Sequence, residues 1–452
     1  MVTIPREAIE RRADQYVEWL TEACSIPSLA ERPEALEQMC EWVETKLTDI
    51  GLDVSRLPIP GAPDALLGTG GTGERTVLVY DHYDVQPVDP IDLWDTHPFE
   101  PSIRNGVFYA RGAADNKGDL VARIAALDAY QRTERELPVN LKFLIEGEEE
   151  VGSPHFPALV SRYGDRLHAD GCIWEGIGID HVGRPELVFG AKGLAYVELN
   201  VRSLAEDQHS SLAAIAPSAA WRLIEALTTL RSPDGKVLID SFYDDVVPPT
   251  PEDEDMLAAL PFEEDQERAR LGTSRFVGDA TGIDLVRRYF FEPTCNIAGL
   301  DSGYTVPGGS KTVLPKQAMA KLDMRLVPNQ DPEDIVAKLK KHLSERGFDD
   351  IEVTYLGGQP AVRSPADSLI GRAAVAAAKV FEAEPAVSPL MIGTGPMYPI
   401  AGHLGIPTVS PAGVCRPDSN IHAPNENVRV DDFVQIIEYT VGWVNAFATV
   451  PA

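Results

Sequence analysis

Several apolar segments of this chain run directly into acidic residues or histidine, and this pattern constrains the fold most. Residues 77–80 (VLVY) are apolar and long enough for one buried strand, and they precede the polar run Asp81-His82-Tyr83-Asp84. Their β-branched content fits a parallel sheet, whose strands are buried on both faces. In open α/β sheets, ligands and catalytic groups gather at the carboxyl ends of strands. The sequence therefore predicts a functional site at the end of this strand.

The side chains of His82 and Asp84 share one face of an extended chain, because they are two residues apart. A carboxylate in this position can fix the tautomer of the imidazole and direct its other nitrogen at a metal ion. Residues 111–118 (RGAADNKG) predict a glycine-bounded loop that presents Asp115 ahead of a helix. One histidine and one aspartate do not define a metal site, so a capped loop with a hydrogen-bonded histidine remains the alternative at this stage.

Further charged groups follow later predicted strands. Residues 137–145 (LPVNLKFLI) run into the carboxylates of residues 146–150 (EGEEE), a short strand over 171–174 ends in Glu175, and His422 lies in a polar loop. Crowded carboxylates raise each other's pKa unless cations lie among them. The alternative interpretation of residues 146–150 is an exposed acidic turn. This mixed nitrogen and oxygen donor set suits zinc, or less specifically manganese or cobalt.

Five separated sequence blocks resemble the M20 family of di-zinc metallopeptidases. That family includes carnosinase-like dipeptidases, glutamate carboxypeptidases, aminoacylases and deacylases of N-acyl amino acids. The resemblance covers nearly the whole chain and implies an enzyme that hydrolyses amide bonds with two Zn²⁺ per chain, Mn²⁺ or Co²⁺ being possible. The blocks are YDHYDVQP (80–87), PFEP (98–101), NGVFYARGAADNKG (105–118), EGEEEVGS (146–153) and IHAPNE (421–426).

The resemblance assigns metal-binding roles residue by residue. His82 matches the histidine ligand of the first zinc, and Glu175 matches its acidic ligand. Asp115 matches the aspartate that bridges both metals. Glu150 and His422 match the carboxylate and the histidine of the second zinc.

The resemblance also assigns the groups that support the chemistry. Glu149 matches the general base, and Asp84 matches the carboxylate behind the first histidine. The three-glutamate run leaves its register open until the next residues are read. Because the family's glutamate pair directly precedes x-Gly-Ser, residues 151–153 (VGS) identify Glu149 and Glu150 as that pair and leave Glu148 outside the site.

The character of the sequence changes near residue 191. Residues 195–201 (AYVELNV) alternate apolar and polar side chains, as strands do in a sheet with one solvated face. We therefore expect an α/β catalytic domain, with a mostly parallel sheet and helices on both faces, in residues 1–191 and 359–452. An inserted α+β domain is expected in residues 192–358, and the resemblance implies that it serves as a lid and in homodimer formation.

Four residues are candidates for contacts with the substrate. His209 matches a histidine that reaches the partner subunit's active site, where it would donate to an oxyanion. Arg325 matches a lid arginine, and its guanidinium can grip a carboxylate through two hydrogen bonds. Asn296 and Gly395 are weaker candidates. The alternatives are a lone loop histidine for His209 and a surface ion pair for Arg325.

Two departures from the family pattern affect the expected substrate. Dipeptidases of the family usually carry glycine before the first histidine, whereas this chain has Asp81, which either tunes His82 or points away from it. Carnosinase-like members carry an Arg-Glu-Gly-Gly-Ser loop where residues 393–399 read GTGPMYP. The uncharged loop favours a substrate with a neutral or amidated group, and it leaves Arg325 as the main candidate anion anchor.

Composition excludes several classes of partner. The 452 residues carry 40 basic and 70 acidic side chains, a net charge of −30, which disfavours nucleic acids and anionic membranes. The five cysteines show no CxxC spacing and predict no disulfide framework. Residues 1–20 lack the apolar core of a signal peptide, and no stretch approaches the ~20 apolar residues of a membrane span. We expect a cytoplasmic protein.

The leading hypothesis is a metal-dependent hydrolase that cleaves the amide bond of a dipeptide or small peptide-like substrate, with Glu149 as the base. The first alternative is a deacylase of N-acyl amino acids. A non-catalytic relative that uses the fold for binding is a remote alternative, because all the ligands and the base are present. A two-metal phosphodiesterase would need basic residues around the site, and none cluster there in the sequence.

Overall fold

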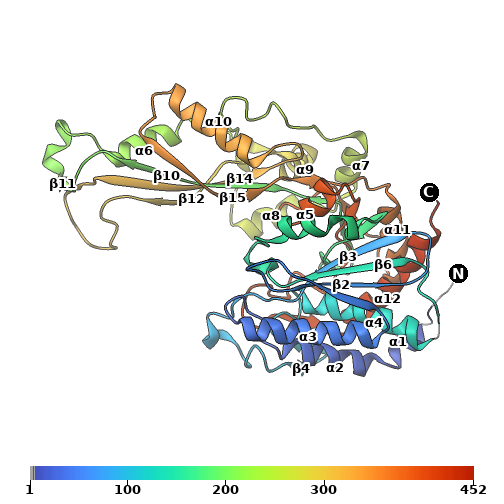
Figure 1. The fold of residues 1–452 in the computed structure, drawn as a ribbon. Coiled ribbons are helices and arrows are strands. Elements are labelled where there is room, and N and C mark those ends of the chain that lie inside the picture. Colours follow the sequence, from blue (N-terminus) through green and yellow to red (C-terminus); the bar gives the residue numbers. More distant parts are fainter. Residues whose placement is uncertain (1–3, 5, 134, 452) are drawn as a thin grey trace. The chain divides into compact units, whose positions relative to one another are not determined.

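The computed structural model describes residue 4, residues 6–133 and residues 135–451, which divide into two units (Figure 1). The first unit holds the described residues up to Gly190, Arg363–Pro389, and the described residues from Pro396 onward. The second unit holds Ala191–Val362 together with Leu390–Gly395. The second unit therefore interrupts the first twice along the chain.

A six-stranded sheet forms the centre of the first unit. The strand β3 lies between β6 and β7 and runs parallel to both, and β7 is parallel to β18. An antiparallel pair, β1 and β2, continues the sheet beyond β6. The order across the sheet is β1 (Asp53–Leu57), β2 (Ala65–Gly70), β6 (Asn140–Glu146), β3 (Thr76–His82), β7 (Gly171–Ile173) and β18 (Thr408–Val409).

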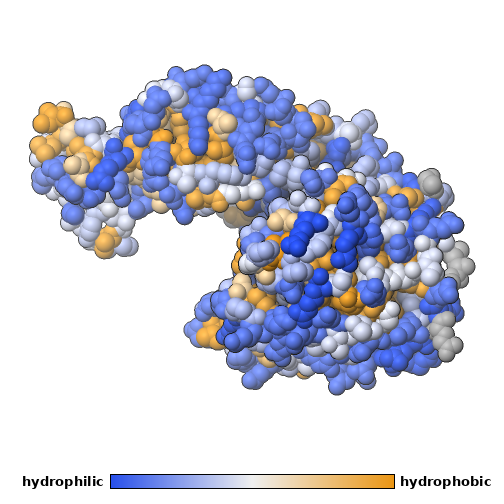
Figure 2. All heavy atoms as spheres, in the orientation of Figure 1, coloured by the Kyte–Doolittle hydropathy of each residue, from blue (hydrophilic) through white to orange (hydrophobic). Residues whose placement is uncertain are grey.

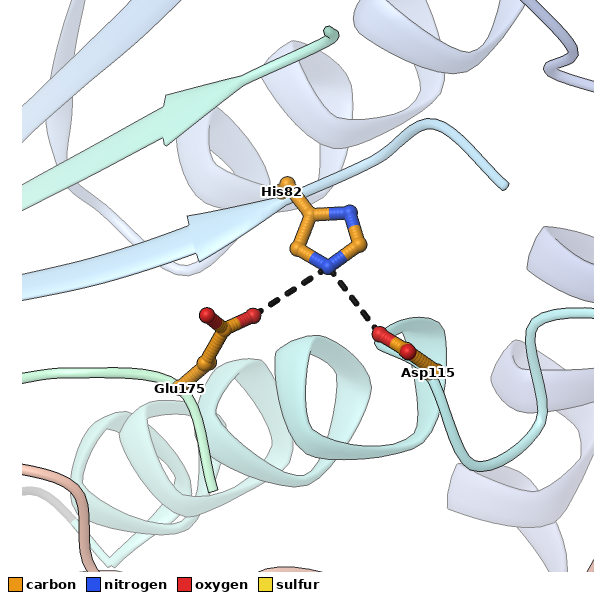
Figure 3. Close-up of side chains that lie close together, drawn as sticks. All are labelled: His82, Asp115 and Glu175. Carbon is orange, nitrogen blue, oxygen red and sulfur yellow. Dashed lines mark hydrogen bonds and ion pairs between the residues drawn. The ribbon is translucent and has the colours of Figure 1, made fainter. Parts of the chain in front are cut away.

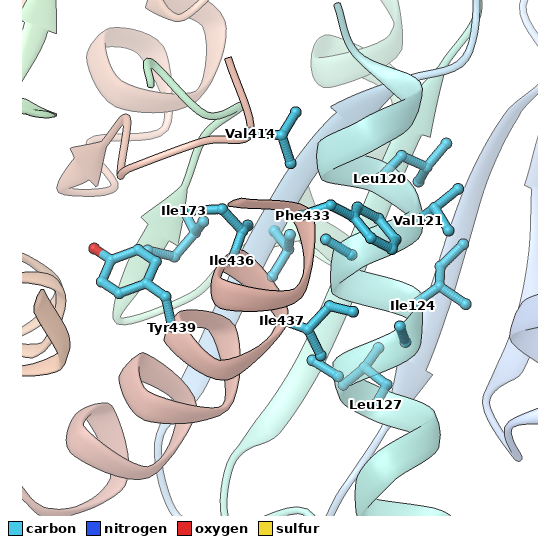
Figure 4. Packing of buried hydrophobic residues seen from close by; sticks show 14 of the residues in the cluster. Leu120, Val121, Ile124, Leu127, Ile173, Val414, Phe433, Ile436, Ile437 and Tyr439 are labelled. Atoms are coloured by element: carbon cyan, nitrogen blue, oxygen red, sulfur yellow. The ribbon is translucent and has the colours of Figure 1, made fainter. Parts of the chain in front are cut away.

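Helices cover both faces of this sheet. One face packs against a large apolar cluster in which Ile124 of α4 lies beside Phe433 and Ile437 of α12 (Figure 4). On the opposite face, Tyr80 stacks on Trp174 with ring centroids 3.6 Å apart and meets Phe156 of α5 edge-on. The helices of the first face are α2 (Ala13–Cys24), α3 (Pro33–Asp49), α4 (Lys117–Arg132), α11 (Leu369–Ala377) and α12 (Val430–Thr449), and α5 (Phe156–Leu167) covers the second.

Shorter elements complete the first unit. The helix α1 (Arg6–Glu10) precedes α2, and β8 (Glu186–Val188) pairs in parallel with β17 (Ala386–Ser388). A three-stranded antiparallel sheet has the order β19 (Asn427–Arg429), β5 (Val107–Tyr109) and β4 (Ser102–Arg104). The chain passes between the units within β9 (Gly190–Ala191) and β16 (Val362–Arg363), and again at both ends of Leu390–Gly395.

The second unit is built on a four-stranded antiparallel sheet, whose inward residues, such as Val197 and Leu322, pack against Leu223 of α6 and Leu339 of α10. The strand order is β12 (Asn296–Asp301), β14 (Gln317–Leu326), β10 (Gly193–Arg202) and β15 (Ile351–Gln359). The helices are α6 (Ala219–Leu227), α7 (Pro251–Ala259), α8 (Glu264–Leu271), α9 (Gly282–Phe291) and α10 (Pro332–Glu345), and β11 (Gln208–His209) pairs with β13 (Val313–Leu314). The structure thus confirms the predicted fold class.

Hydrophilic residues cover most of the surface seen in Figure 2, as the large net charge requires. A small hydrophobic patch lies at the tip near β11, where Leu212 and Ile215 are exposed. Among the helices that the structure describes, none is long and apolar enough to cross a membrane.

Candidate metal centre

Three residues from separate segments meet at the carboxyl end of the central sheet (Figure 3). His82 is the last residue of β3, Glu175 follows the neighbouring parallel strand β7, and Asp115 lies in the loop before α4. The Nε2 atom of His82 is 3.2 Å from Asp115 Oδ1 and 3.3 Å from Glu175 Oε2. The indole N–H of Trp174 donates to the other oxygen of Glu175, at 2.9 Å, and so orients its carboxylate. These three side chains form the first ligand group.

A second ligand group shares Asp115 with the first. The Nε2 atom of His422 lies 3.0 Å from Asp115 Oδ2 and 3.2 Å from Glu150 Oε2. In each group, the candidate ligand atoms all lie within 4.8 Å of one another. Because the two oxygens of Asp115 face different histidines, this one carboxylate is placed to serve two ions.

The donor set fits divalent cations. The Oε1 atom of Glu150 is buried and has no hydrogen-bond partner among the described residues. Hydrogen bonds to Asp115 and to Glu150 raise the pKa of His422 to about 10. Burial alone would raise the pKa of Asp115, but hydrogen bonds from His422 and His82 hold it well below its usual range. The cluster therefore attracts positive charge, as a two-metal site of carboxylates and imidazoles does.

Asp84 connects the first histidine to the glutamate run. Its buried carboxylate accepts hydrogen bonds from the backbone N–H groups of Glu149, at 3.1 Å, and Glu150, at 3.0 Å. The same carboxylate lies 3.3 Å from Nδ1 of His82. Burial, followed by the charge of Glu175, raises the pKa of the Glu149 carboxyl well above its ordinary value. Glu149 is thus held next to both ligand groups without belonging to either.

Glu148 turns away from this cluster. Its carboxylate accepts a hydrogen bond from the backbone N–H of His155, at 2.8 Å, and lies 2.9 Å from Nδ1 of the same histidine. The preceding Gly147 packs so closely on Tyr83 that a Cβ atom there would lie 2.3 Å from the ring. A side chain at position 147 would therefore displace the glutamate run.

Glu426 is a buried residue of this region that the sequence analysis did not identify. Its carboxylate accepts hydrogen bonds from the backbone N–H groups of Gly112, Ala114 and Asp115, at 2.8–3.0 Å. Glu426 lies four positions after His422 and therefore ties the loop of His422 to the loop of Asp115. The only sign in the sequence that Glu426 belongs to the site was its place in the polar block 421–426.

Three further polar side chains stabilise the same loops and were also missed. Arg111 donates to the Glu426 carboxylate at 2.6 Å. The buried Lys117 ammonium donates to the carbonyl oxygens of Ala23 and Ile26, at the end of α2. Gln86 donates to the Glu150 carboxylate at 3.0 Å. Nothing in the sequence indicated that Arg111 and Lys117 are buried, because burial of a basic residue depends on partners that are distant along the chain.

The predicted substrate-contacting residues belong to the second unit. The backbone N–H of Ser211 donates to Nδ1 of the exposed His209, at 3.2 Å. Because a backbone N–H can only donate, the neutral imidazole carries its proton on Nε2, which lies 3.2 Å from the hydroxyl of Thr312. His209 therefore carries an N–H donor at the end of the exposed short strand β11.

Arg325 and Asn296 lie on neighbouring strands of the second unit. Asn296 donates to the Asp323 carboxylate at 2.8 Å, and Arg325 donates to the hydroxyl of Thr394 at 2.6 Å. Among the described residues, no carboxylate forms an ion pair with Arg325, which differs from the surface ion pair weighed as the alternative. Gly395 lies in the same short segment as Thr394, with open space where a Cβ would be.

Comparisons with known proteins identify the family. The profile of Peptidase family M20/M25/M40 matches residues 78–446. The chain belongs to the M20 peptidase family. It is therefore a peptidase hydrolase, and membership implies binding of a divalent metal, for which the two ligand groups are the candidates.

Individual relatives match three quarters or more of the chain. A solved M20 family metallo-carboxypeptidase from Sulfolobus solfataricus is 36% identical, with a TM-score of 0.89 over 96% of this chain and 99% of that one. The Beta-Ala-His dipeptidase of Homo sapiens is 29% identical over 94% of this chain and 89% of the relative. The Cys-Gly metallodipeptidase of Schizosaccharomyces pombe is 28% identical over 75% of each chain.

Substitutions in the glutamate run should separate a base from a ligand. We expect Glu149→Gln to retain the metal content of the wild type and to lose about 10²–10⁴-fold in turnover, because it removes a proton acceptor and no ligand. Glu150→Gln should instead lose metal, measured by elemental analysis after desalting. Glu148→Gln is the matched control and should keep both properties. A depleted Glu149→Gln with a replete Glu150→Gln would mean that the register is wrong by one residue.

Proposed function

We propose that this M20 peptidase is a di-zinc dipeptidase that hydrolyses the amide bond of a dipeptide or a similarly small peptide. The observation that supports this most directly is the sharing of Asp115 by two ligand groups, each with one histidine and one glutamate. Similarity to dipeptidases and to a metallo-carboxypeptidase supports a small peptide as the substrate.

The residues of the centre would divide the work as follows. His82 and Glu175 would hold one ion, Glu150 and His422 would hold the other, and Asp115 would bridge them. When bound, two such ions would lower the pKa of a water molecule and polarise the scissile carbonyl.

Glu149 would take the proton of the attacking water and deliver it to the leaving amine. Burial and the charge of Glu175 raise the pKa of its carboxyl, and a raised pKa makes a carboxylate a better proton acceptor. Asp84 would keep the Glu149 backbone and the His82 ring in place through its three contacts.

Arg325 would bind the carboxylate of the substrate. Among the described residues Arg325 forms no ion pair, and its guanidinium donates a hydrogen bond to the neutral Thr394 hydroxyl. A carboxylate could replace that contact with a stronger bidentate one. A neutral or amidated substrate group is the alternative that the uncharged loop leaves open.

The second unit would also mediate a homodimer. Among the described strands, β12 pairs only with β14, so its other edge is free. This strand carries the exposed Ile297 and Leu300, and beside it lies a groove of about 570 Å³ lined in part by Ile224 and Leu227 of α6. A second copy of the chain would cover this apolar edge, which a monomer rarely leaves bare.

Light scattering should then give twice the mass of one chain.

The substrate class is tested with a panel of dipeptides, N-acyl amino acids and amidated dipeptides, each assayed with zinc, manganese or cobalt. We expect the dipeptides to be hydrolysed with the highest kcat/KM. Turnover of N-acyl amino acids alone would instead identify a deacylase, and absence of turnover with a full complement of metal would contradict the proposal.

A second prediction concerns Arg325. We expect Arg325→Ala to raise KM about ten- to a hundred-fold for substrates with a free carboxylate, since a hydrogen bond to a charged group contributes roughly 1.5–3 kcal/mol. The amidated analogues should change little. Lys321→Ala removes a positive charge from the same face of β14 and is the matched control, with an unchanged ratio of acid to amide. Equal losses on acids and amides would contradict the assignment.

A third prediction concerns His209, which we propose serves the active site of the partner subunit. Oxyanion donors contribute about 10²–10³-fold in rate, so His209→Ala should be nearly inactive with its metal retained. The test mixes His209→Ala dimers with Glu149→Ala dimers and lets them exchange subunits. Each mixed dimer then has one active site that contains both an intact Glu149 and an intact His209. Activity should return to about a quarter of the wild-type value if chains pair at random.

Exchange is monitored independently of activity, by native mass spectrometry of chains that carry tags of different mass. Confirmed exchange without recovery of activity would show that His209 serves its own chain or takes no part in the reaction.

A further inference from the structure

Asp81 precedes the first histidine, and its side chain is directed away from it. Side chains alternate along β3, so Val79 and Asp81 face α4 while Tyr80 and His82 face the opposite side. Asp81 is fully buried, although it is a charged residue on an apolar strand. A buried carboxylate persists only with partners that offset its desolvation, so its contacts indicate what it does.

Asp81 has two partners, and both belong to segments that carry or adjoin a proposed ligand. Its Oδ1 atom accepts a hydrogen bond of 2.7 Å from the side-chain amide of Asn116, the residue directly after Asp115. Its Oδ2 atom lies 2.8 Å from Nη1 of Arg123 on α4. The carboxylate therefore links the end of β3 to the Asp115 loop and to a buried guanidinium.

Arg123 extends this link to the neighbouring strand. Its Nη1 group donates to the carbonyl oxygen of Tyr80, at 2.8 Å, and its Nη2 group donates to that of Trp174, at 2.6 Å. Trp174 directly precedes Glu175, and Tyr80 precedes Asp81 and His82. One guanidinium thus holds the carboxyl ends of β3 and β7 at a fixed separation.

We propose that Asp81 and Arg123 form a positioning pair that holds His82, Asp115 and Glu175 in the arrangement that binds the first metal ion. The proposal rests on the metal chemistry proposed above for the same three ligands. A buried ion pair contributes little net stability compared with packed apolar side chains, so a structural role alone explains this pair poorly. Its three contacts with other residues, Asn116, Tyr80 and Trp174, instead define the relative positions of three ligand-bearing segments.

Asp128, which lies on α4 as Arg123 does, provides a matched control for Asp81. Like Asp81, it is a fully buried carboxylate; it lies 3.1 Å from Nε of Arg12 and accepts hydrogen bonds from Tyr16, at 3.0 Å, and from Arg132, at 3.2 Å. No ligand of either metal group is among these partners. Asp81→Asn and Asp128→Asn therefore each remove the charge of a fully buried carboxylate, and only the first touches the proposed positioning network.

The experiment measures zinc affinity by competition with a chromogenic chelator, the visible spectrum of the cobalt-substituted protein, and the melting temperature without metal. We expect both variants to have a lower melting temperature than the wild type. Asp81→Asn alone should bind the first ion about 10–100-fold more weakly and shift the cobalt spectrum, as expected when support of a ligand is lost. The double variant Asp81→Asn/Arg123→Gln should bind the ion no more tightly than Asp81→Asn, because it also loses the guanidinium that links the carboxyl ends of β3 and β7.

Wild-type affinity and an unchanged cobalt spectrum in Asp81→Asn would overturn the inference and leave Asp81 as a core ion pair. Failure of the wild-type protein to bind two ions would instead overturn the proposed function. If Asp81→Asn does not fold, Arg123→Lys replaces it, since lysine keeps the charge beside Asp81 but cannot hold both carbonyl groups with a planar fork. Unchanged metal affinity in that variant would equally contradict the proposal.

Discussion

The concentration of negative charge around two imidazoles is the constraint on which the structure depends. Asp115, Glu150 and Glu175 approach the ring nitrogens of His82 and His422 at 3.0–3.3 Å. Carboxylates this close to one another are stable only when positive charge lies among them. The parallel sheet brings them together because the carboxyl ends of β3 and β7 lie at the same edge.

The fold holds these carboxylates in place with buried basic residues. Arg111, Lys117 and Arg123 are almost fully buried, in a chain whose acidic residues far outnumber its basic ones. Each donates to backbone carbonyl oxygens or to a carboxylate beside the ligand loops, so their charge is used to fix loop geometry. Glu426 complements them by accepting from three backbone N–H groups of the Asp115 loop.

The second unit shows the opposite use of polar groups. Arg325 lies on β14 and His209 on the exposed short strand β11, and neutral hydroxyl or backbone groups are their hydrogen-bond partners among the described residues. Charged partners would hold these side chains permanently, whereas neutral ones are readily exchanged for a substrate group. The first unit therefore holds the candidate ligands through many buried hydrogen bonds, whereas Arg325 and His209 in the second unit have neutral partners.

The sequence alone determined the fold class and the segments that carry the candidate ligands, because an apolar strand followed by a polar residue is a local pattern. The alternation along β3 also restricts Asp81 and His82 to opposite faces. Only the tertiary structure decided that Asp81 meets Arg123, that Glu148 turns to His155, and that Glu426 binds a loop 311 positions away. Such contacts join distant parts of the chain, and their geometry follows from packing that no local pattern contains.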